Sequence, residues 1–393
     1  MKIAIVTFYR APNYGAMLQA LALWKYLETL GHEVIFVRQS RFATKRWPQL
    51  LDCFISRSLH SMRAKFLGYV RWPISNFAAS YPQTMFCETL DDVRRATADC
   101  DTFIVGSDQI WNSLWWPSEV DLRISMLDFA PEGKPRLAYA VSFGNKEWPT
   151  PKNAHQVGER LKKFTKISVR EQSGVDLVQK LSERTDAVCL LDPTLLHTAD
   201  FYRGVVAKAL PRREVCETES PYIFRYVLEW DDVSITDRAL KAVESKLGVE
   251  KVVDVYTPVR GLLAPIMRLL GVTAKVPVPE WLLRIAHSDF VFTDSFHGTV
   301  FSILFHKPFI SLLIRGSMKG MNERILSLLD ILGLSDRAVY ADEVESWLPN
   351  IVKPIDWNDV EKRLAAWREK TAEFFKLSGI MALERNVSEK KRS

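Results

Sequence analysis

The residues best suited to chemistry in this sequence stand together at positions 294–299. There the chain reads DSFHGT, which supplies an acid, two hydroxyls, an imidazole and a glycine: Asp294, Ser295, His297, Gly298 and Thr299. A hydrophobic strand at 290–293 precedes them and an apolar helix at 299–305 follows. Free N–H groups and the helix dipole at such a helix start favour an anion, and His297 can exchange a proton near neutral pH. The pattern indicates a small phosphorylated substrate whose reaction needs proton transfer.

A purely structural interpretation of the same residues stays open. Ser295 or Asp294 can cap the helix, and a single histidine is often a core residue with satisfied hydrogen bonds. Asp294 is therefore either a base or an N-cap. The glycine beside the hydroxyls favours function, because Gly298 lets the backbone approach a ligand closely.

Polar residues also follow the strands predicted in the first half of the chain. These strands are expected at 2–8, 34–37, 102–105, 137–142, 167–169 and 187–191. A helical pattern between the first two makes a βαβ unit and hence a parallel sheet. Ligands of such sheets bind beyond the carboxyl ends of the strands. The polar candidates there include Asn13, Tyr14, Gly15, Ser107, Asp108, Gln109, Arg170 and Asp192.

Arg170 directly follows a strand predicted to be buried, where a guanidinium is costly unless it meets an anion. One alternative is an ion pair with an acid of the same chain, which would be Glu171, Asp176 or Asp192. The other is a substrate carboxylate or phosphate bound in bidentate fashion. The sequence leaves both open.

A second series of strands and helices begins near position 221. We expect an α/β fold of two Rossmann-like αβα domains facing each other across a cleft. The first domain is expected at 1–208, with a basic and aromatic insertion at 41–85, and the second at 221–345. A polar linker at 209–220 joins them, and 346–393 is expected to form a helix that packs back on the first domain, followed by a basic tail.

Composition and missing motifs exclude several classes of protein. The 393 residues include no apolar run long enough to span a bilayer, and the apolar start is too short for a signal peptide. Five scattered cysteines without a C-x-x-C pair argue against disulfides and structural zinc and favour a reducing cytoplasm. The turn NYGA at 13–16 is no dinucleotide fingerprint, and no phosphate loop, H-E-x-x-H or G-x-S-x-G motif occurs.

The segment at 41–72 is strongly basic. Seven Lys or Arg residues stand there against the single acid Asp52, with aromatic residues between them. It could lie against an anionic membrane surface, aided by 260–268, or bind an anionic substrate. The alternative is a solvated insertion whose aromatic side chains pack inward.

Seven segments match one family in order along most of the chain. They are NYGAMLQALALWKYLETLGHEV (13–34), FIVGSDQIWN (103–112), AYAVSFG (138–144), ISVREQSG (167–174), LLDPTLL (190–196), TDSFHGTVFSILFHKPF (293–309) and NERILSLLDILGL (322–334). Through them the chain resembles the polysaccharide pyruvyl transferases, most specifically through the sixth. Positions 41–85 and the tail beyond about 336 match no pattern of the family.

The resemblance implies a fold similar to GT-B glycosyltransferases and transfer of the pyruvyl group of phosphoenolpyruvate. Two hydroxyls of a sugar in a bacterial surface polysaccharide, or in its lipid-linked precursor, would become a ketal, and phosphate would leave. Phosphoenolpyruvate is a co-substrate, so no cofactor or metal is expected, nor is nucleic acid a partner. The enzyme would act in the cytoplasm or at the inner face of the cytoplasmic membrane.

The resemblance also assigns roles to the candidate residues. His297 would be the general acid/base, with Arg170 and Asp294 as further catalytic candidates. The donor would be held by Arg170, Ser295, His297, Gly298 and Thr299, and by Asn322 and Arg324 unless these cap their own helix. The acceptor sugar would face Asn13, Tyr14, Gly15, Ser107, Asp108 and Gln109.

Two rival functions remain compatible with the sequence. A glycosyltransferase with a nucleotide-sugar donor would share the architecture, although no acidic residue is placed convincingly for the ribose. A non-catalytic paralogue that only binds glycan is the other; intact Arg170 and His297 argue against it.

Overall fold

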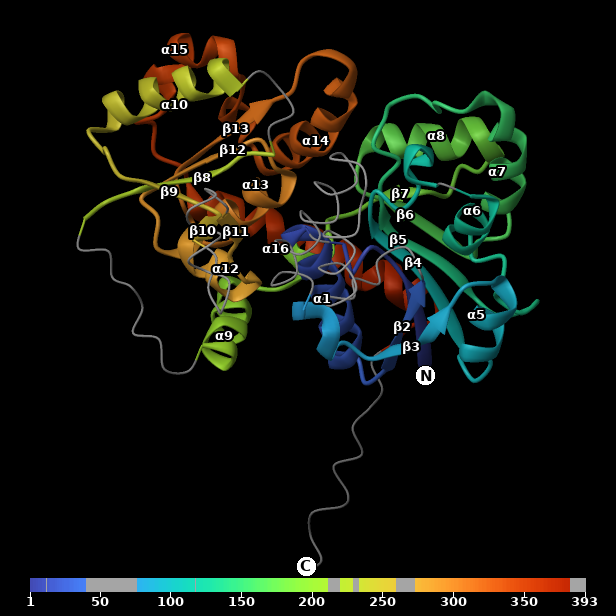
Figure 1. Ribbon diagram of the computed structural model, residues 1–393. Helices are drawn as coiled ribbons and strands as arrows, with labels where there is room; N and C mark the ends of the chain where they lie inside the picture. Colours follow the sequence, from blue (N-terminus) through green and yellow to red (C-terminus); the bar gives the residue numbers. More distant parts are fainter. Residues whose placement is uncertain are drawn as a thin grey trace, which may run out of the picture.

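Two αβα halves face each other in the computed structural model (Figure 1). It describes residues 1–11, 13–39, 76–116, 118–210, 220–228, 233–258 and 273–381. The basic segment at 41–72, most of the predicted linker, the segment at 260–268 and the basic tail lie outside the described residues. Among the described residues, no helix combines the length and the apolar character needed to cross a membrane.

The first half is built on a seven-stranded parallel sheet of order β3-β2-β1-β4-β5-β6-β7. Its strands are β1 (Lys2–Val6), β2 (Glu33–Gln39), β3 (Gln83–Cys87), β4 (Thr102–Asp108), β5 (Arg136–Val141), β6 (Lys166–Val169) and β7 (Val188–Cys189). Ile3 pairs with Val34 on one side and Thr102 on the other, which places β1 in the interior of the sheet. Helices α1 (Tyr14–Thr29), α5 (Leu90–Ala96), α6 (Glu119–Ser125), α7 (Ala154–Leu161) and α8 (Gln172–Ser182) connect the strands.

The second half has a five-stranded parallel sheet of order β14-β13-β12-β8-β9. Its strands are β8 (Ile223–Tyr226), β9 (Val252–Asp254), β12 (Phe290–Thr293), β13 (Phe309–Leu313) and β14 (Ala338–Tyr340), with a separate antiparallel pair, β10 (Tyr256–Pro258) and β11 (Thr273–Lys275). Its helices are α10 (Val233–Leu247), α12 (Val278–Ala286), α13 (Phe296–Leu304), α14 (Asn322–Leu332) and α15 (Val344–Trp347). Both sheets are parallel, so each directs its carboxyl ends to one edge, where ligands of such folds bind.

The apolar residues form three clusters rather than one core per half. One cluster lies between the first sheet and α5 to α8, and another between the second sheet and α10 and α15. The third is shared: it joins α1 and the inner face of the first sheet to α12, α13 and α14 of the second half. The two halves are therefore packed on each other through a common core.

Two helices cross from one half to the other. Helix α9 (Ala199–Ala209) follows the first sheet in sequence, yet it packs against α12, and the rings of Tyr202 and Phe301 meet at 4.8 Å. Helix α16 (Trp357–Leu377) follows the second sheet and returns to the first half, where the Phe375 and Tyr139 rings lie 4.8 Å apart. Figure 1 shows α16 running between the halves.

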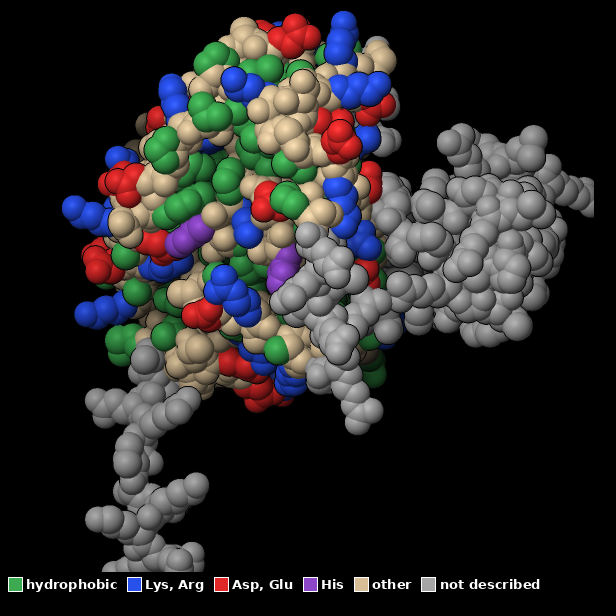
Figure 2. Space-filling view, turned by 90° about the vertical axis from the view of Figure 1, so that its left-hand side faces the viewer, with side chains coloured by type: hydrophobic (Ala, Val, Ile, Leu, Met, Phe, Trp, Pro, Cys, Tyr) green, Lys and Arg blue, Asp and Glu red, His purple; other side chains and the backbone are tan. Residues whose placement is uncertain are grey.

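The outer surface of the second half carries charges of both signs. Figure 2 shows Lys and Arg side chains interspersed with Asp and Glu side chains over this face. Elsewhere on the second half, the exposed guanidinium of Arg315 lies 2.9 Å from Asp342 and 2.7 Å from Glu343. Exposed pairs of this kind contribute little to stability but leave these charges compensated.

The predicted α/β class with two facing Rossmann-like units is confirmed. Some observed element boundaries differ from the predicted ones: α13 begins three residues before the expected 299, and β7 is shorter than the expected strand at 187–191. Strand β3 lies at the end of the predicted insertion and was not foreseen, because QTMFC has no clear alternation.

Candidate active site

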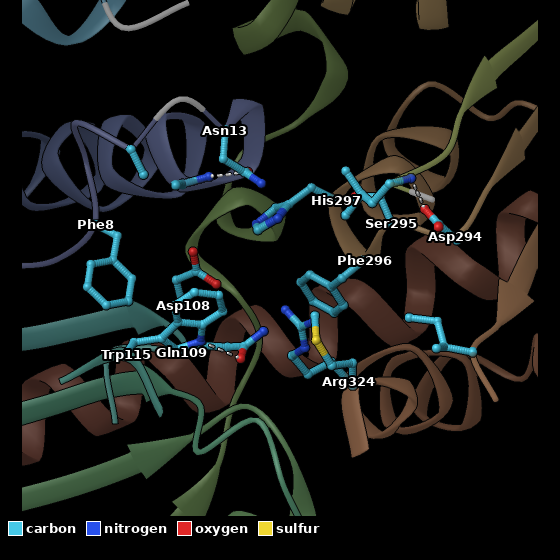
Figure 3. A pocket seen from close by; sticks show the side chains of 15 residues that line it. Phe8, Asn13, Asp108, Gln109, Trp115, Asp294, Ser295, Phe296, His297 and Arg324 are labelled. Atoms are coloured by element: carbon cyan, nitrogen blue, oxygen red, sulfur yellow. Dashed lines mark hydrogen bonds between the residues drawn. The ribbon is translucent and has the colours of Figure 1, made fainter. Parts of the chain in front are cut away.

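A cavity of about 510 Å³ lies between the carboxyl ends of the two sheets. The first half contributes Phe8, Ala11, Asn13, Ala16, Asp108, Gln109 and Trp115 to its lining, and the second half contributes Leu228, Asp294, Ser295, Phe296, His297, Ile314, Met321 and Arg324. Figure 3 shows the labelled side chains converging on this space from both halves. The cavity thus brings together residues that are up to about 300 positions apart in sequence.

The start of α13 forms one wall of the cavity. Ser295 is its N-cap and accepts a hydrogen bond from the Gly298 N–H at 3.4 Å. Asp294 accepts one from the Leu228 N–H at 2.7 Å, which ties β8 to β12. The N-cap role therefore belongs to Ser295, and the Asp294 carboxylate lines the cavity while bound to the backbone.

His297 lies where the two halves meet. Its side chain is buried, and its Nε2 lies 3.7 Å from Asp192 Oδ2 without a hydrogen-bond partner in the described residues. On its other side the imidazole lies against the backbone of Gly15 at the start of α1, where no side chain is present. The imidazole is therefore fixed by residues of the first half although it belongs to the second.

Asp192 is fully buried behind the cavity and holds several donors at once. Its Oδ2 accepts from Arg170 Nη1 at 2.7 Å and from Ser107 Oγ at 3.1 Å, and its Oδ1 accepts from the N–H and hydroxyl of Thr194. Burial alone would raise the pKa of this carboxyl, but His297, Arg170 and Thr194 outweigh burial and lower it. Asp192 is therefore a carboxylate, and it lies beside the imidazole of His297.

Arg170 is held by acids of its own chain. Its Nη2 lies 3.2 Å from Asp108 Oδ1, its Nη1 binds Asp192, and its Nε is 3.9 Å from Glu171. Burial raises the pKa of Glu171 although Arg170 opposes this effect. Of the two alternatives that the sequence left open, the structure shows the internal ion pairs, and Arg170 does not line the cavity.

Arg324 is a positively charged residue that lines the cavity. It is buried, it forms no ion pair among the described residues, and its Nε has no hydrogen-bond partner there. Burial, together with the charge of Arg170, lowers the pKa of Arg324 to about 10. The guanidinium of Arg324 lies 5.7 Å from the centre of the Phe296 ring, and the guanidinium of Arg170 lies 4.6 Å from the same ring centre. A buried guanidinium without a carboxylate is costly unless an anion joins it.

Other predicted site residues lie in the framework around the cavity. Thr299 binds Ser311 and the Ser295 carbonyl, Gly298 packs against Thr293, and Asn322 bonds to both backbone groups of Ile314. Tyr14 donates to the Val276 carbonyl and stacks on Trp281, and Ser107 binds Asp192. Gly298 has no side chain, and its N–H donates to Ser295. The other residues use their polar side-chain groups on the protein itself, so their predicted contacts with substrate have no support in this geometry.

The acceptor candidates Asn13, Asp108 and Gln109 do line the cavity. Asn13 caps α1 through the Ala16 N–H, and Gln109 Oε1 accepts from Asn112 and from the Trp115 indole. Sequence reasoning missed the aromatic members of the lining, Phe8, Trp115 and Phe296. Aromatic residues between polar motifs are usually core, so nothing in the sequence marked these three.

The sequence matches the family described as polysaccharide pyruvyl transferase over residues 13–317. The chain belongs to this family. The match covers the lining residues from Asn13 to Ile314, whereas Phe8 and Ala11 precede it and Met321 and Arg324 lie just beyond it. No curated protein matches the sequence at a significant level.

Solved structures with the same architecture show the fold. A putative UDP-N-acetylglucosamine 2-epimerase from Listeria monocytogenes has a TM-score of 0.51 at 13% identity, over 95% of this chain and 96% of that one. A UDP-N-acetylglucosamine 2-epimerase from Rickettsia bellii has a TM-score of 0.51 at 8% identity, over 97% of each chain. This pyruvyl transferase family member therefore has a GT-B-type fold.

Proposed function

We propose that the protein transfers the pyruvyl group of phosphoenolpyruvate onto two hydroxyls of a sugar and forms a ketal. The observation that carries the proposal is Arg324, a buried cation that lines the same cavity as His297 and has no ion pair among the residues that the structure describes. Phosphoenolpyruvate brings a carboxylate and a phosphate, the anions that a guanidinium binds best. Membership of the family supports the reaction type.

Arg324 is the proposed donor-binding residue in place of Arg170. The guanidinium of Arg170 is engaged by Asp192 and Asp108, whereas that of Arg324 faces no acid within ion-pairing distance in the described residues. Arg170 then keeps Asp192 ionised and fixed behind His297. Ser295 adds a hydroxyl on the same wall.

His297 is the proposed source of the proton for the methylene carbon of phosphoenolpyruvate. Asp192 stabilises the imidazolium before the transfer, at 3.7 Å from Nε2. Protonation makes the central carbon electrophilic, and a first sugar hydroxyl adds to it. The bond to the phosphate oxygen then breaks, and a second hydroxyl closes the ketal.

Both hydroxyl protons must be removed during this sequence. One replaces the proton that His297 delivered, and the other leaves on the phosphate, so the reaction consumes no external acid or base. Asp108, a carboxylate on the wall contributed by the first half, is the proposed base for the hydroxyl whose proton it then passes to the departing phosphate. Asn13 and Gln109 supply further hydrogen-bonding groups on that wall.

The acceptor is proposed to be a sugar of a bacterial surface polysaccharide or its lipid-linked precursor. In the second case the reaction would take place at the inner face of the cytoplasmic membrane. A wall of Phe8 and Trp115 offers apolar surface for a sugar ring.

The test is an assay that follows phosphate release and acceptor mass together. The protein is incubated with phosphoenolpyruvate and a panel of galactosides, mannosides and amino sugars, and acceptor-dependent phosphate release with a pyruvyl mass gain is expected. His297→Gln should abolish both signals, whereas His155→Gln, at the start of α7 and away from the cavity, should leave them unchanged. Binding of a nucleoside diphosphate but not of phosphoenolpyruvate would refute the proposal and favour a nucleotide-sugar donor.

A further inference from the structure

A short loop that follows β5 connects the two walls of the cavity. Its first residue of interest is Gly144, whose φ of +71° favours glycine. Gly144 packs so closely on Gln109 and Asn112 that an added methyl group would come within 2.5 Å of Gln109 Oε1. Its N–H also donates to Ser142 Oγ at 3.0 Å. The loop is thereby held on the first half beside Gln109, which lines the cavity (Figure 3).

The next two residues of the loop reach the second half. Asn145 lies against Gly320, where an added methyl group would come within 2.6 Å of Asn145 Oδ1 and within 3.3 Å of the Gly144 carbonyl oxygen. Lys146 Nζ forms an ion pair with Glu323 Oε1 at 2.9 Å. We call Gly144, Asn145 and Lys146 the clasp, because these consecutive residues join the two halves beside the cavity.

Both contacts of the clasp fall on the segment that carries Arg324. Gly320 belongs to the 3₁₀-helix η6 (Gly316–Met321), and Glu323 stands in the first turn of α14, directly before Arg324. Arg324 lines the cavity from this segment. The clasp therefore connects the wall of the first half with Arg324 through a continuous series of contacts.

Arg324 depends on the position of its helix more than Arg170 does. The guanidinium of Arg170 is fixed by ion pairs with Asp192 and Asp108. Arg324 forms no ion pair in the described part of the chain, and its Nε has no hydrogen-bond partner there. Without such partners, a guanidinium lies where its backbone places it, and a displacement of about 1 Å is enough to disturb a reacting geometry. What holds the start of α14 against the first half therefore also sets the place of Arg324.

We propose that Asn145 and Lys146 are positioning residues, which hold Arg324 at the distance from the first half that brings the donor to the acceptor wall. The role of Arg324 in this statement rests on the proposed function, whereas the contact between the halves does not. His297 is held separately, by Gly15 and Asp192. Loss of the clasp should therefore raise the KM for phosphoenolpyruvate and leave kcat nearly unchanged.

The first experiment measures amide hydrogen exchange in Asn145→Ala/Lys146→Met and needs no donor. We expect the amides of 319–328 to exchange about tenfold faster than in the wild type, because this segment opens more easily once the clasp is lost. The amides of α16 should keep their protection. The matched control is Lys134→Met, which removes an exposed ion pair with Asp101 at the amino ends of β4 and β5. Exchange at 319–328 that is unchanged in the double variant would overturn the proposal.

The second experiment uses uncharged substitutions, so that no change of field at Arg324 contributes. Gly320→Ala should raise the KM for phosphoenolpyruvate by about tenfold at a kcat within about twofold of the wild-type value. The same substitution in an Asn145→Ala background should change KM by less than about twofold, because the oxygen that the methyl group meets is gone. Gly204→Ala, where nothing lies within 4 Å, is the control and should have no effect.

The outcomes separate this proposal from the proposed function. An equal rise of KM in both backgrounds, or a fall of kcat at constant KM, would refute the positioning role. Faster exchange with an unchanged KM would do the same and leave the proposed function in place. A wild-type protein that neither binds nor turns over phosphoenolpyruvate would refute the proposed function, and with it the donor role of the clasp, even if the exchange data confirmed the contact.

Discussion

The imidazole of His297 lies so close to the backbone of Gly15 that a methyl group on Gly15 would come within 1.9 Å of Nδ1. The two residues belong to different halves, one to the start of α1 and the other to the start of α13. A glycine is needed here to leave room for the ring, since its backbone angles are ordinary for a helix. The contact couples the packing of the two halves to the position of the proposed proton donor.

Replacing Gly15 with alanine is therefore predicted to move the His297 ring and to lower turnover by about a hundredfold, because small displacements of catalytic groups carry penalties of that order. The folded state should survive, since alanine favours a helix over glycine by about 1 kcal/mol. The matched control is Gly204→Ala in α9, where an added methyl group meets nothing within 4 Å. If Gly15→Ala retained full turnover, the ring position would not depend on this contact.

Asp192→Asn is predicted to lower both turnover and stability. Removing one partner of this buried charge network leaves Arg170 with only Asp108 and the more distant Glu171, and should cost up to about 3–5 kcal/mol in the free energy of unfolding. The pKa of Asp192 is lowered in the folded protein, so the carboxylate stabilises the fold above the unfolded value of about 4 and this effect is lost as pH falls below it. Urea denaturation of both proteins between pH 7 and pH 3 should show the difference shrinking in acid. If Asp192 positions His297, the pH profile of turnover should also shift in the Asp192→Asn variant.

Arg324→Met should make the protein more stable and less able to bind the donor. The folded pKa of Arg324 is about 10, below its ordinary value, so its charged form is penalised at every pH below that range. Removing the charge should raise the free energy of unfolding by about 1–4 kcal/mol. The affinity for phosphoenolpyruvate should fall by about tenfold or more, since hydrogen bonds to charged groups contribute roughly 1.5–3 kcal/mol. Thermal melting with and without phosphoenolpyruvate measures both effects, and Arg324→Lys, which keeps a charge, should lie between the two proteins. A variant that is more stable but binds the donor as before would exclude Arg324 from the donor site.

Asn322→Ala is predicted to affect the fold rather than the donor. Its amide group donates to the Ile314 carbonyl and accepts from the Ile314 N–H, both at 2.8 Å and both buried. Leaving these two backbone groups unpaired should cost about 2–4 kcal/mol, measured by chemical denaturation. The KM for phosphoenolpyruvate should stay within about twofold of the wild-type value, because Asn322 is outside the cavity lining. An increased KM at unchanged stability would instead support the role that the sequence suggested for this residue.

The rule that ligands lie beyond the carboxyl ends of parallel strands located much of the cavity from sequence alone. Asp108, Gln109, Asp294, Ser295 and His297 were found in this way, and all line it. The rule works because strand ends follow from local apolar patterns and a parallel sheet collects them at one edge.

The ion-pair partners of the charged residues could not be predicted from the sequence in the same way. Arg170 meets Asp192 across 22 positions and Asp108 across 62, and either side chain could as well have faced a substrate. Arg324 is distinguished by having no acid within ion-pairing distance in the described part of the chain, and no local sequence pattern records this. Tyr14 and Gly15 were expected to face the acceptor, but the orientation of α1 turns Tyr14 onto Trp281 and Gly15 onto His297.

The shared apolar cluster between the halves affects how the molecule denatures. Because α1, α12, α13 and α14 contribute to one cluster, and because α9 and α16 each pack across the boundary, neither half can lose its structure without exposing the inner face of the other. Heat should therefore melt the whole chain in one cooperative step, with a single calorimetric peak instead of the two that independent domains would give. The catalytic cleft would then disappear at the same temperature as the fold itself.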